Sequence, residues 1–249
     1  MPYCDSTYIR PDTVTLYANT NEAFLTGSVK GIILELPGLG GGSCMGGSMD
    51  LQEYSAPHAK TFAENGIVLA YLFPGPWSWG NRGAVRMADA VVAALAEKYA
   101  LGEDFPLLVS GGSMGGQGSL LYAAETRYKL RGVAAACPCT DIPALFSVRP
   151  EFPRTLISAA AGYDMPLKEA LLQLSPIHRV NDMPDTAYYI CSNSADELIP
   201  ESQIDVFTEA LQNRGISVIY RRQPETFHGQ FLPEVWDEMH RFMLERILA

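Results

Sequence analysis

The sequence predicts an α/β fold in which a mainly parallel sheet carries helices on both faces. Short apolar runs alternate with longer stretches of helical periodicity from residue 31 to the carboxyl end. Most of these runs are continuous rather than alternating in polarity, which is typical of parallel strands buried on both faces. No repeat or low-complexity linker divides the chain, so we expect residues 1–249 to form a single domain.

Apolar runs with the length and composition of buried strands predict a sheet of seven or eight strands. These runs are residues 13–17, 31–36, 67–73, 107–110, 132–136, 186–191 and 217–221. Helical patterns occupy residues 84–99, 114–127, 201–214 and 233–248. Pro200 and Pro233 stand where a first helical turn accepts proline, and Gly215 stands where a helix stops.

One segment interrupts this alternation. Residues 140–175, between the fifth and sixth predicted strands, contain four prolines among short apolar pieces. They form either an ordinary long connection with short helices or a small cap over the functional site. The cap is favoured because long insertions in compact domains usually serve function.

The composition limits the classes of partner. Hydrophobic residues make up 47% of the chain and charged residues 18%, as in a protein with a large buried core. The formal net charge of -10 disfavours nucleic acid and anionic membranes, because their phosphates would be repelled. No apolar run approaches the length of a membrane span, and residues 1–5 do not begin a secretory signal.

The five cysteines are odd in number and include no CxxC pair. We therefore expect neither a disulfide framework nor a zinc site, and we expect a reducing, cytoplasmic environment. The one close pair, Cys137 and Cys139, is interpreted as structural. No metal or other cofactor is expected.

The most informative stretch joins a predicted strand to a predicted helix at Ser113. It reads LLVSGGSMGGQG over residues 107–118. Gly111-x-Ser113-x-Gly115 in this context indicates a nucleophile elbow, a sharp turn that presents a serine hydroxyl above the sheet. The stretch lacks the lysine of a P-loop and the spacing of GxGxxG. Two other glycine-flanked serines, Ser43 and Ser48, lack a glycine two residues further on.

A serine nucleophile needs a base, and the base needs an acid to hold its tautomer. Of the four histidines, only His228 lies between the last predicted strand and the last predicted helix, at the same sheet edge as an elbow. Asp196 follows the preceding strand and is the candidate acid. Its alternative role is to cap the helix near Pro200, and Glu197 is its nearest competitor.

A second glycine-rich loop follows the second predicted strand, over residues 35–42. A tetrahedral intermediate needs two donors aimed at its oxyanion. The backbone N–H of Met114 is one candidate and that of Leu39 the other, with Gly40 as the next choice. The alternative is a flexible glycine loop without a catalytic part.

Substrate contacts are expected from Gly40 and from the loop after residues 67–73, which carries Trp77 and Trp79. Both tryptophans fall at the predicted active edge of the sheet. They either line a pocket for an acyl or sugar group or anchor the loop by packing.

Together these features resemble the α/β-hydrolase superfamily over roughly residues 29–248. The resemblance is greatest to the branch that contains dienelactone hydrolases, prolyl-oligopeptidase-type catalytic domains and bacterial acetyl or feruloyl esterases. The matching segments, in the order oxyanion loop, elbow, acid loop and histidine loop, are residues 36–40, 111–116, 196–200 and 227–229. Two departures are Ile199 where the acid loop has valine and Pro37 where the oxyanion loop often has histidine.

The resemblance implies Ser113 as nucleophile, Asp196 as acid and His228 as base, with oxyanion donors at Leu39 and Met114. We therefore expect a serine hydrolase that cleaves carboxylic esters of a small or carbohydrate-linked molecule through an acyl-enzyme. The alternatives are a prolyl-oligopeptidase-type peptidase and a non-catalytic binding protein on the same fold. A small-molecule ester is the expected partner, and the chain is expected to be a monomer or a homodimer.

Overall fold

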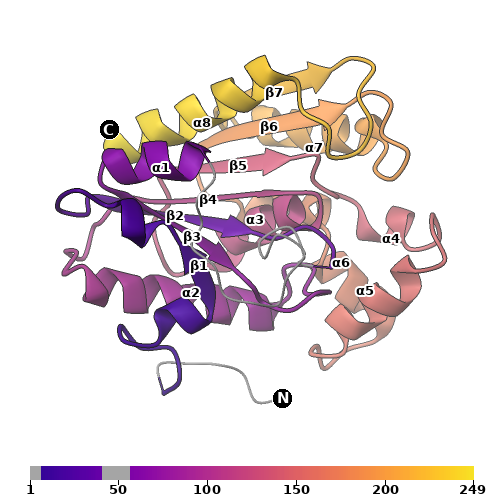
Figure 1. Cartoon of the computed structure of the whole chain (residues 1–249). Helices are drawn as coiled ribbons and strands as arrows, with labels where there is room; N and C mark the ends of the chain where they lie inside the picture. Colours follow the sequence, from indigo (N-terminus) through magenta and orange to yellow (C-terminus); the bar gives the residue numbers. More distant parts are fainter. Residues whose placement is uncertain (1–6, 41–56) are drawn as a thin grey trace.

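The computed structural model describes residues 7–40 and 57–249. In this part of the chain seven strands form one sheet in the order β1-β3-β2-β4-β5-β6-β7 (Figure 1). The strand β1 is antiparallel to β3, and all other neighbours pair in parallel. The predicted fold class is confirmed. The strand order reverses between β2 and β4, and ligands of open α/β sheets bind beyond the carboxyl ends of the strands at such a switch point.

The elements have the following bounds. The strands are β1 (Ala18–Thr20), β2 (Gly31–Leu36), β3 (Ile67–Leu72), β4 (Leu107–Gly112), β5 (Gly132–Ala136), β6 (Ala187–Asn193) and β7 (Val218–Gln223). The α-helices are α1 (Pro57–Glu64), α2 (Arg82–Lys98), α3 (Met114–Glu125), α4 (Ile142–Leu145), α5 (Phe152–Ala160), α6 (Leu167–Gln173), α7 (Glu201–Asn213) and α8 (Pro233–Leu248). The 3₁₀ turns are η1 (Val14–Leu16), η2 (Glu22–Phe24) and η3 (Pro176–Asp182).

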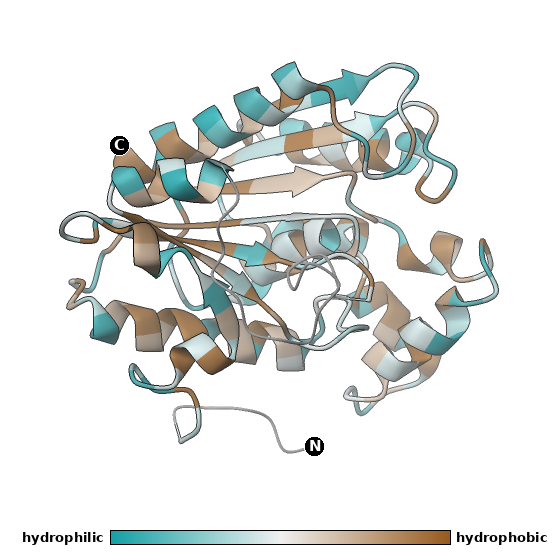
Figure 2. Ribbon diagram, in the orientation of Figure 1, coloured by the Kyte–Doolittle hydropathy of each residue, from teal (hydrophilic) through white to brown (hydrophobic). Residues whose placement is uncertain are grey.

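The sheet separates two apolar cores, because successive side chains of a strand point to opposite faces. On β2, Ile33 packs in the core beneath α1 and α8, whereas Ile32 and Leu34 pack in the larger core with α2, α3 and α7. Figure 2 shows hydrophobic colour on the central strands and hydrophilic residues along the outer side of α8. Within the described residues, no helix combines the length and apolar character that a membrane span requires.

The prediction of a strand over residues 13–17 is wrong. The chain forms the 3₁₀ turn η1 there, and the strand β1 begins at Ala18. Of the apolar residues in this run, Val14 is buried whereas Leu16 is exposed. The run therefore places Val14 in the core, with the partly buried Tyr17 packed against it, and forms no strand face.

Residues 140–175 fold into the helices α4, α5 and α6, which lie beyond the carboxyl ends of the strands (Figure 1). Three of the four prolines of this segment stand at the starts of these helices. Pro143 and Pro153 stand in the first turns of α4 and α5, and Pro166 is the N-cap of α6. Proline is tolerated at these positions because the first N–H groups of a helix have no partner within it.

Candidate active site

Ser113 occupies the junction between β4 and α3 in a backbone conformation that side chains rarely adopt, with φ 57° and ψ -123°. Its N–H donates a hydrogen bond to the carbonyl oxygen of Ala136 in β5 at 2.8 Å. Its carbonyl accepts one from the N–H of Gln117 in α3 at 3.0 Å. Bonds on both sides fix the turn, and the hydroxyl is presented at the edge of the sheet, as a nucleophile elbow requires.

Two glycines allow the backbone to approach closely at this turn. A Cβ at Gly115 would lie 2.1 Å from the carbonyl oxygen of Leu36 at the end of β2. A Cβ at Gly111 would lie 2.5 Å from the carbonyl group of Gly115. Real Cβ atoms do not come this close to backbone, so any side chain would push α3 away from the sheet. The Gly-x-Ser-x-Gly spacing is therefore a packing requirement of the elbow.

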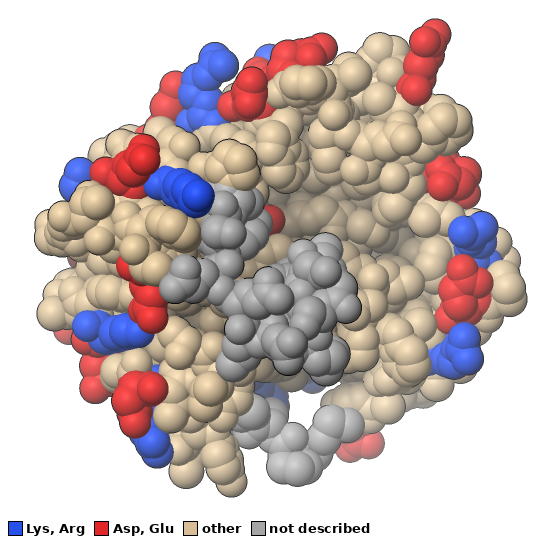
Figure 3. Space-filling model, viewed as in Figure 1, with Lys and Arg blue, Asp and Glu red and all other residues tan. Residues whose placement is uncertain are grey.

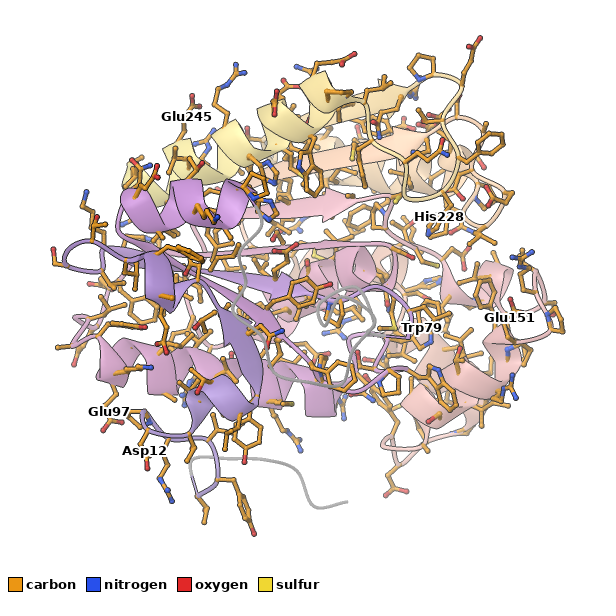
Figure 4. All side chains as sticks on the ribbon, in the orientation of Figure 1. Asp12, Trp79, Glu97, Glu151, His228 and Glu245 are labelled. Carbon is orange, nitrogen blue, oxygen red and sulfur yellow. The ribbon has the colours of Figure 1, made fainter. Side chains whose placement is uncertain are left out.

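The histidine loop between β7 and α8 brings His228 to Ser113. Its Nε2 lies 2.8 Å from Ser113 Oγ, and its Nδ1 lies 2.7 Å from Asp196 Oδ2. The three side chains thus form a continuous hydrogen-bonded chain from residues far apart in the sequence. The His228 side chain is 14% exposed and that of Asp196 is 1% exposed, so solvent reaches the imidazole rather than the carboxylate. Figure 4 labels His228 at the edge where the strands end.

Both carboxylate oxygens of Asp196 have partners. Oδ2 faces His228, and Oδ1 accepts hydrogen bonds from the N–H groups of Leu198 and Ile199 at 2.9 Å each. The carboxylate therefore organises its own loop while it holds the imidazole. The competing acid Glu197 instead accepts a 3.4 Å hydrogen bond from the backbone N–H of His228.

Two buried side chains, which the sequence pattern did not single out, brace the histidine loop. Asn193, the last residue of β6, donates from Nδ2 to the carbonyl oxygens of Phe227 and Gln230 at 2.8 and 2.5 Å. Gln223, the last residue of β7, accepts a hydrogen bond from the N–H of Leu232 at 2.8 Å. The bonds fall on either side of His228, so these residues fix where its ring stands. The one sequence signal for these residues is that each is an amide side chain at the end of a strand.

The candidate oxyanion donors differ in their hydrogen bonding. The N–H of Gly40 donates to the carbonyl oxygen of Pro76 at 2.8 Å, so it is engaged elsewhere. Among the described residues, the N–H groups of Met114 and Leu39 donate no hydrogen bond. Met114 is the first residue of α3, where the helix dipole favours negative charge. The rest of the glycine loop, with Ser43 and Ser48, lies outside the described residues.

The two tryptophans of the loop after β3 have different environments. Trp77 is 41% exposed, whereas Trp79 is buried at 2%. The Trp79 indole N–H donates to Thr155 Oγ1 in α5 at 3.1 Å, and its ring meets Phe152 edge-on at 6.0 Å between centroids. The sequence left open whether these tryptophans line a pocket or anchor the loop. Trp79 packs as an anchor, whereas Trp77 presents its ring to solvent.

Cys137, interpreted from the sequence as structural, lies next to the site. Its Sγ, a carboxylate oxygen of Asp196 and a ring nitrogen of His228 are all within 4.8 Å of one another. Burial raises the pKa of the Cys137 thiol to about 12. At neutral pH the thiol is therefore protonated and weakly nucleophilic.

Two other histidines lie away from the elbow, between α1 and α8. The rings of His58 and His240 stack at 4.4 Å between centroids, and Trp236 meets both edge-on. Burial lowers the pKa of His58 to about 4. Burial, with a smaller contribution from His58, lowers the pKa of His240 to about 3. This pair is partly buried and, with Trp236, lines a pocket between α1 and α8.

Comparisons with known proteins add information on the fold. No protein-family model matches the sequence, and no curated protein matches it in a sequence search. A puromycin hydrolase structure matches 89% of this chain and 34% of its own, with 19% identity and a TM-score of 0.66. Esterase B from Lactobacillus Rhamnosis matches 89% of this chain and 76% of its own, with 13% identity and a TM-score of 0.62.

The Pyrococcus horikoshii acylaminoacyl peptidase matches 88% of this chain and 36% of its own, with 13% identity and a TM-score of 0.68. The chain thus spans about a third of the length of the first peptidase and puromycin hydrolase structures that it matches. At these identities the likeness concerns the fold. These proteins have the α/β-hydrolase fold, and their architecture matches the seven-stranded, mostly parallel sheet of this chain. This chain therefore has the α/β-hydrolase fold.

Proposed function

We propose that this chain is a serine hydrolase that cleaves carboxylic esters through an acyl-enzyme on Ser113. The proposal rests on the hydrogen-bonded chain from Asp196 through His228 to the Ser113 hydroxyl. A hydroxyl is a poor nucleophile at neutral pH and needs a base within about 2.6–3.2 Å to take its proton. The distance from His228 Nε2 to Ser113 Oγ, 2.8 Å, satisfies this condition.

In the proposed reaction, Ser113 Oγ attacks the ester carbonyl while His228 Nε2 takes the hydroxyl proton. The imidazolium is stabilised by Asp196, whose Oδ2 accepts the hydrogen bond from Nδ1. His228 then returns the proton to the departing alcohol, and the acyl group stays on Ser113. A water molecule, deprotonated by His228 in the same way, releases the acid and restores the hydroxyl.

The tetrahedral intermediates carry a negative oxygen that needs donors in place beforehand. We assign this role to the N–H groups of Met114 and Leu39, which donate no hydrogen bond within the described residues. Gly40 is not assigned as a donor because its N–H is engaged with Pro76. Instead, that bond holds the loop after β2 against the loop after β3, beside the proposed substrate contacts of Gly40 and Trp77.

An uncharged substrate with an apolar acyl group fits the rim of the site. Leu39, Trp77 and Phe227 are large apolar side chains that are 37%, 41% and 55% exposed. They stand on three loops that meet around Ser113, since Gly40 bonds to Pro76 and Phe227 precedes His228. On the face shown in Figure 3, the charged side chains of the described residues lie mostly at the periphery.

We further propose that residues 140–175 form the cap of this site. The helices α4, α5 and α6 lie beyond the strand ends, and Trp79 and Asn81 hold α5 against the loop after β3. A cap in this position would shape the space available to the acyl or alcohol part. We assign Trp79 to this anchoring and leave the pocket contact to Trp77.

A second candidate is hydrolysis of peptide or aminoacyl amide bonds by the same residues. It is favoured by the similarity in fold to the acylaminoacyl peptidase. Assays of aminoacyl and prolyl amides, run beside acetylated sugars, feruloyl esters and simple acyl esters, separate the two candidates. Amide turnover with a kcat/KM above that of every ester would replace the first candidate by the second.

The deciding experiment compares wild type with Ser113→Ala on short p-nitrophenyl esters and with a fluorophosphonate probe. We expect wild type to hydrolyse the esters and to be labelled, and Ser113→Ala to do neither. Asp196→Asn should lower kcat by about 10⁴-fold, because an amide favours the wrong tautomer of His228. Glu197→Gln is the matched control and should retain most activity. Undiminished hydrolysis by Ser113→Ala would refute the assignment, and a wild type that is not labelled would favour a non-catalytic binding protein.

A further inference from the structure

Cys137, Asp196 and His228 bring three different kinds of metal-ligand atom together. The thiol sulfur, a carboxylate oxygen and an imidazole nitrogen lie within 4.8 Å of one another. In the described part of the chain, no other group of three or more histidine, cysteine and acidic side chains is gathered in this way. The sequence prediction of no zinc site relied on short spacing motifs, whereas these ligands come from three separate loops.

The backbone places the thiol here. Cys137 directly follows β5 with φ 37°, and its N–H donates to the carbonyl oxygen of Cys191 in β6 at 2.8 Å. The Cys137 side chain is buried at 1% exposure, and the proposed hydrolysis has no use for it. A buried thiol beside a carboxylate and an imidazole is a donor set that suits Zn²⁺ and related borderline-soft cations.

We infer that a divalent cation of the zinc class binds Cys137 Sγ, Asp196 and His228 Nδ1, and that this binding reversibly inhibits the enzyme. The inhibitory part rests on the proposed function, whereas the binding does not. In a tetrahedral zinc site, sulfur and nitrogen ligands lie about 3.5 Å apart, as follows from Zn–S of about 2.3 Å and Zn–N of about 2.0 Å. The sulfur, which lies within 4.8 Å of the other two ligand atoms, therefore has to move toward them. Nδ1 and Oδ2, which are 2.7 Å apart, have to separate by about half an ångström as metal bonds replace their hydrogen bond.

The inhibition follows from the tautomer of His228. In the resting site Nδ1 carries the proton that Asp196 accepts, and Nε2 is free to take the proton of Ser113. When the cation occupies Nδ1, the ring proton moves to Nε2, and the thiol proton is released to solvent as sulfur becomes a thiolate ligand. The imidazole then presents an N–H to Ser113 and is no longer a base. The route to the site passes His228, which is the most exposed of the three ligands.

The test uses the full chain, kept reduced with a phosphine and titrated with Zn²⁺ alone. We expect Zn²⁺ to inhibit ester hydrolysis and EDTA to restore it. Cys137→Ser should keep its basal activity and need about tenfold more Zn²⁺ for half inhibition, because loss of a ligand costs at least as much affinity as loss of an outer-shell partner. Cys139→Ser is the matched control. Its thiol is also buried but lies against Asp141 and Gln203, so its inhibition should equal that of wild type.

A second measurement does not depend on turnover. Co²⁺ bound to wild type should give thiolate-to-metal charge-transfer absorption in the near ultraviolet, and both Cys137→Ser and Cys137→Ala should lack it. The same Zn²⁺ sensitivity in wild type and Cys137→Ser, or no Co²⁺–thiolate band in wild type, would overturn the inference. If no ester is hydrolysed and Ser113 takes no fluorophosphonate, the proposed function fails while the Co²⁺ band still decides the metal site.

Discussion

The indole N–H of Trp79 donates a hydrogen bond to the hydroxyl oxygen of Thr155 at 3.1 Å, and both side chains are buried. Trp79 belongs to the loop after β3, and Thr155 belongs to α5 in the 140–175 segment. The Thr155 hydroxyl in turn donates to the carbonyl oxygen of Phe152 at 3.0 Å. This short chain of bonds fastens the helices beyond the sheet to a loop beside the candidate site.

Thr155→Val should destabilise the protein by about 1–3 kcal/mol, because it leaves the buried indole N–H of Trp79 without an acceptor. Urea unfolding gives the change in free energy. Thr61→Val is the control: this threonine is exposed on α1, and its replacement should change stability by no more than about 0.5 kcal/mol. Equal stability of Thr155→Val and wild type would show that the bond does not secure α5.

Gly115→Ala should disrupt folding, because its Cβ would lie 2.1 Å from the carbonyl oxygen of Leu36. We expect a loss above about 4 kcal/mol, or no soluble protein. Gly112→Ala is the matched control in the same elbow. Its Cβ would meet nothing closer than 3.9 Å, so its stability should remain within about 1 kcal/mol of wild type. A normal urea midpoint for Gly115→Ala would contradict the close approach of α3 to β2.

Asn193 acts as a positioning residue for His228 because it holds Phe227 and Gln230 on either side of the ring. Asn193→Ala should lower kcat about 10- to 100-fold with little change in KM, since a displaced base loses alignment rather than substrate binding. Asn193→Asp keeps the size but lacks the donor, and its kcat should fall as well. Asn213→Ala, at an exposed position at the end of α7, is the matched control and should be close to wild type. If both Asn193 variants fold and keep the wild-type kcat, the brace has no role in alignment.

The stacked pair His58 and His240 should make stability depend on pH. Burial holds their pKa values at about 4 and about 3, below the ordinary histidine value of 6.5. As pH falls below 6.5, the unfolded chain binds protons that the native state does not, so stability falls between about pH 6.5 and pH 4. Each histidine contributes a slope of up to about 1.4 kcal/mol per pH unit in that window.

Urea unfolding at several pH values measures this slope. His240→Phe keeps an aromatic ring between α1 and α8 without a titrating group, so its slope should be lower by about 1.4 kcal/mol per pH unit. His178→Gln, at an exposed position of η3, should follow wild type. If the free energy of unfolding of wild type and of His240→Phe changed equally with pH, the acid sensitivity would come from groups other than His240.

The sequence predicted the sheet and the meeting of Ser113, Asp196 and His228 because those signals are local. An apolar run followed by glycines marks the elbow, and parallel strands bring the loops at their carboxyl ends to one edge. The error at residues 13–17 has a local cause too. Apolar residues in a short run resemble a strand, and only tertiary packing showed that Val14 alone is buried.

Contacts that join distant loops could not be predicted from the sequence. Asn193 and Phe227 are 34 residues apart, and Trp79 and Thr155 are 76 apart. No pattern of polarity or spacing encodes such a pair. The same holds for Cys137, whose proximity to Asp196 and His228 follows from the end of β5 lying beside the end of β6.

The positive φ of Ser113 implies a conflict between stability and chemistry at one residue. A residue with a side chain in such a conformation costs about 1–3 kcal/mol, and glycine would relieve most of that cost. A chain optimised for stability alone would carry glycine at position 113, at the expense of its only hydroxyl in the elbow. The protein therefore tolerates local strain at the one position where the proposed nucleophile has to stand.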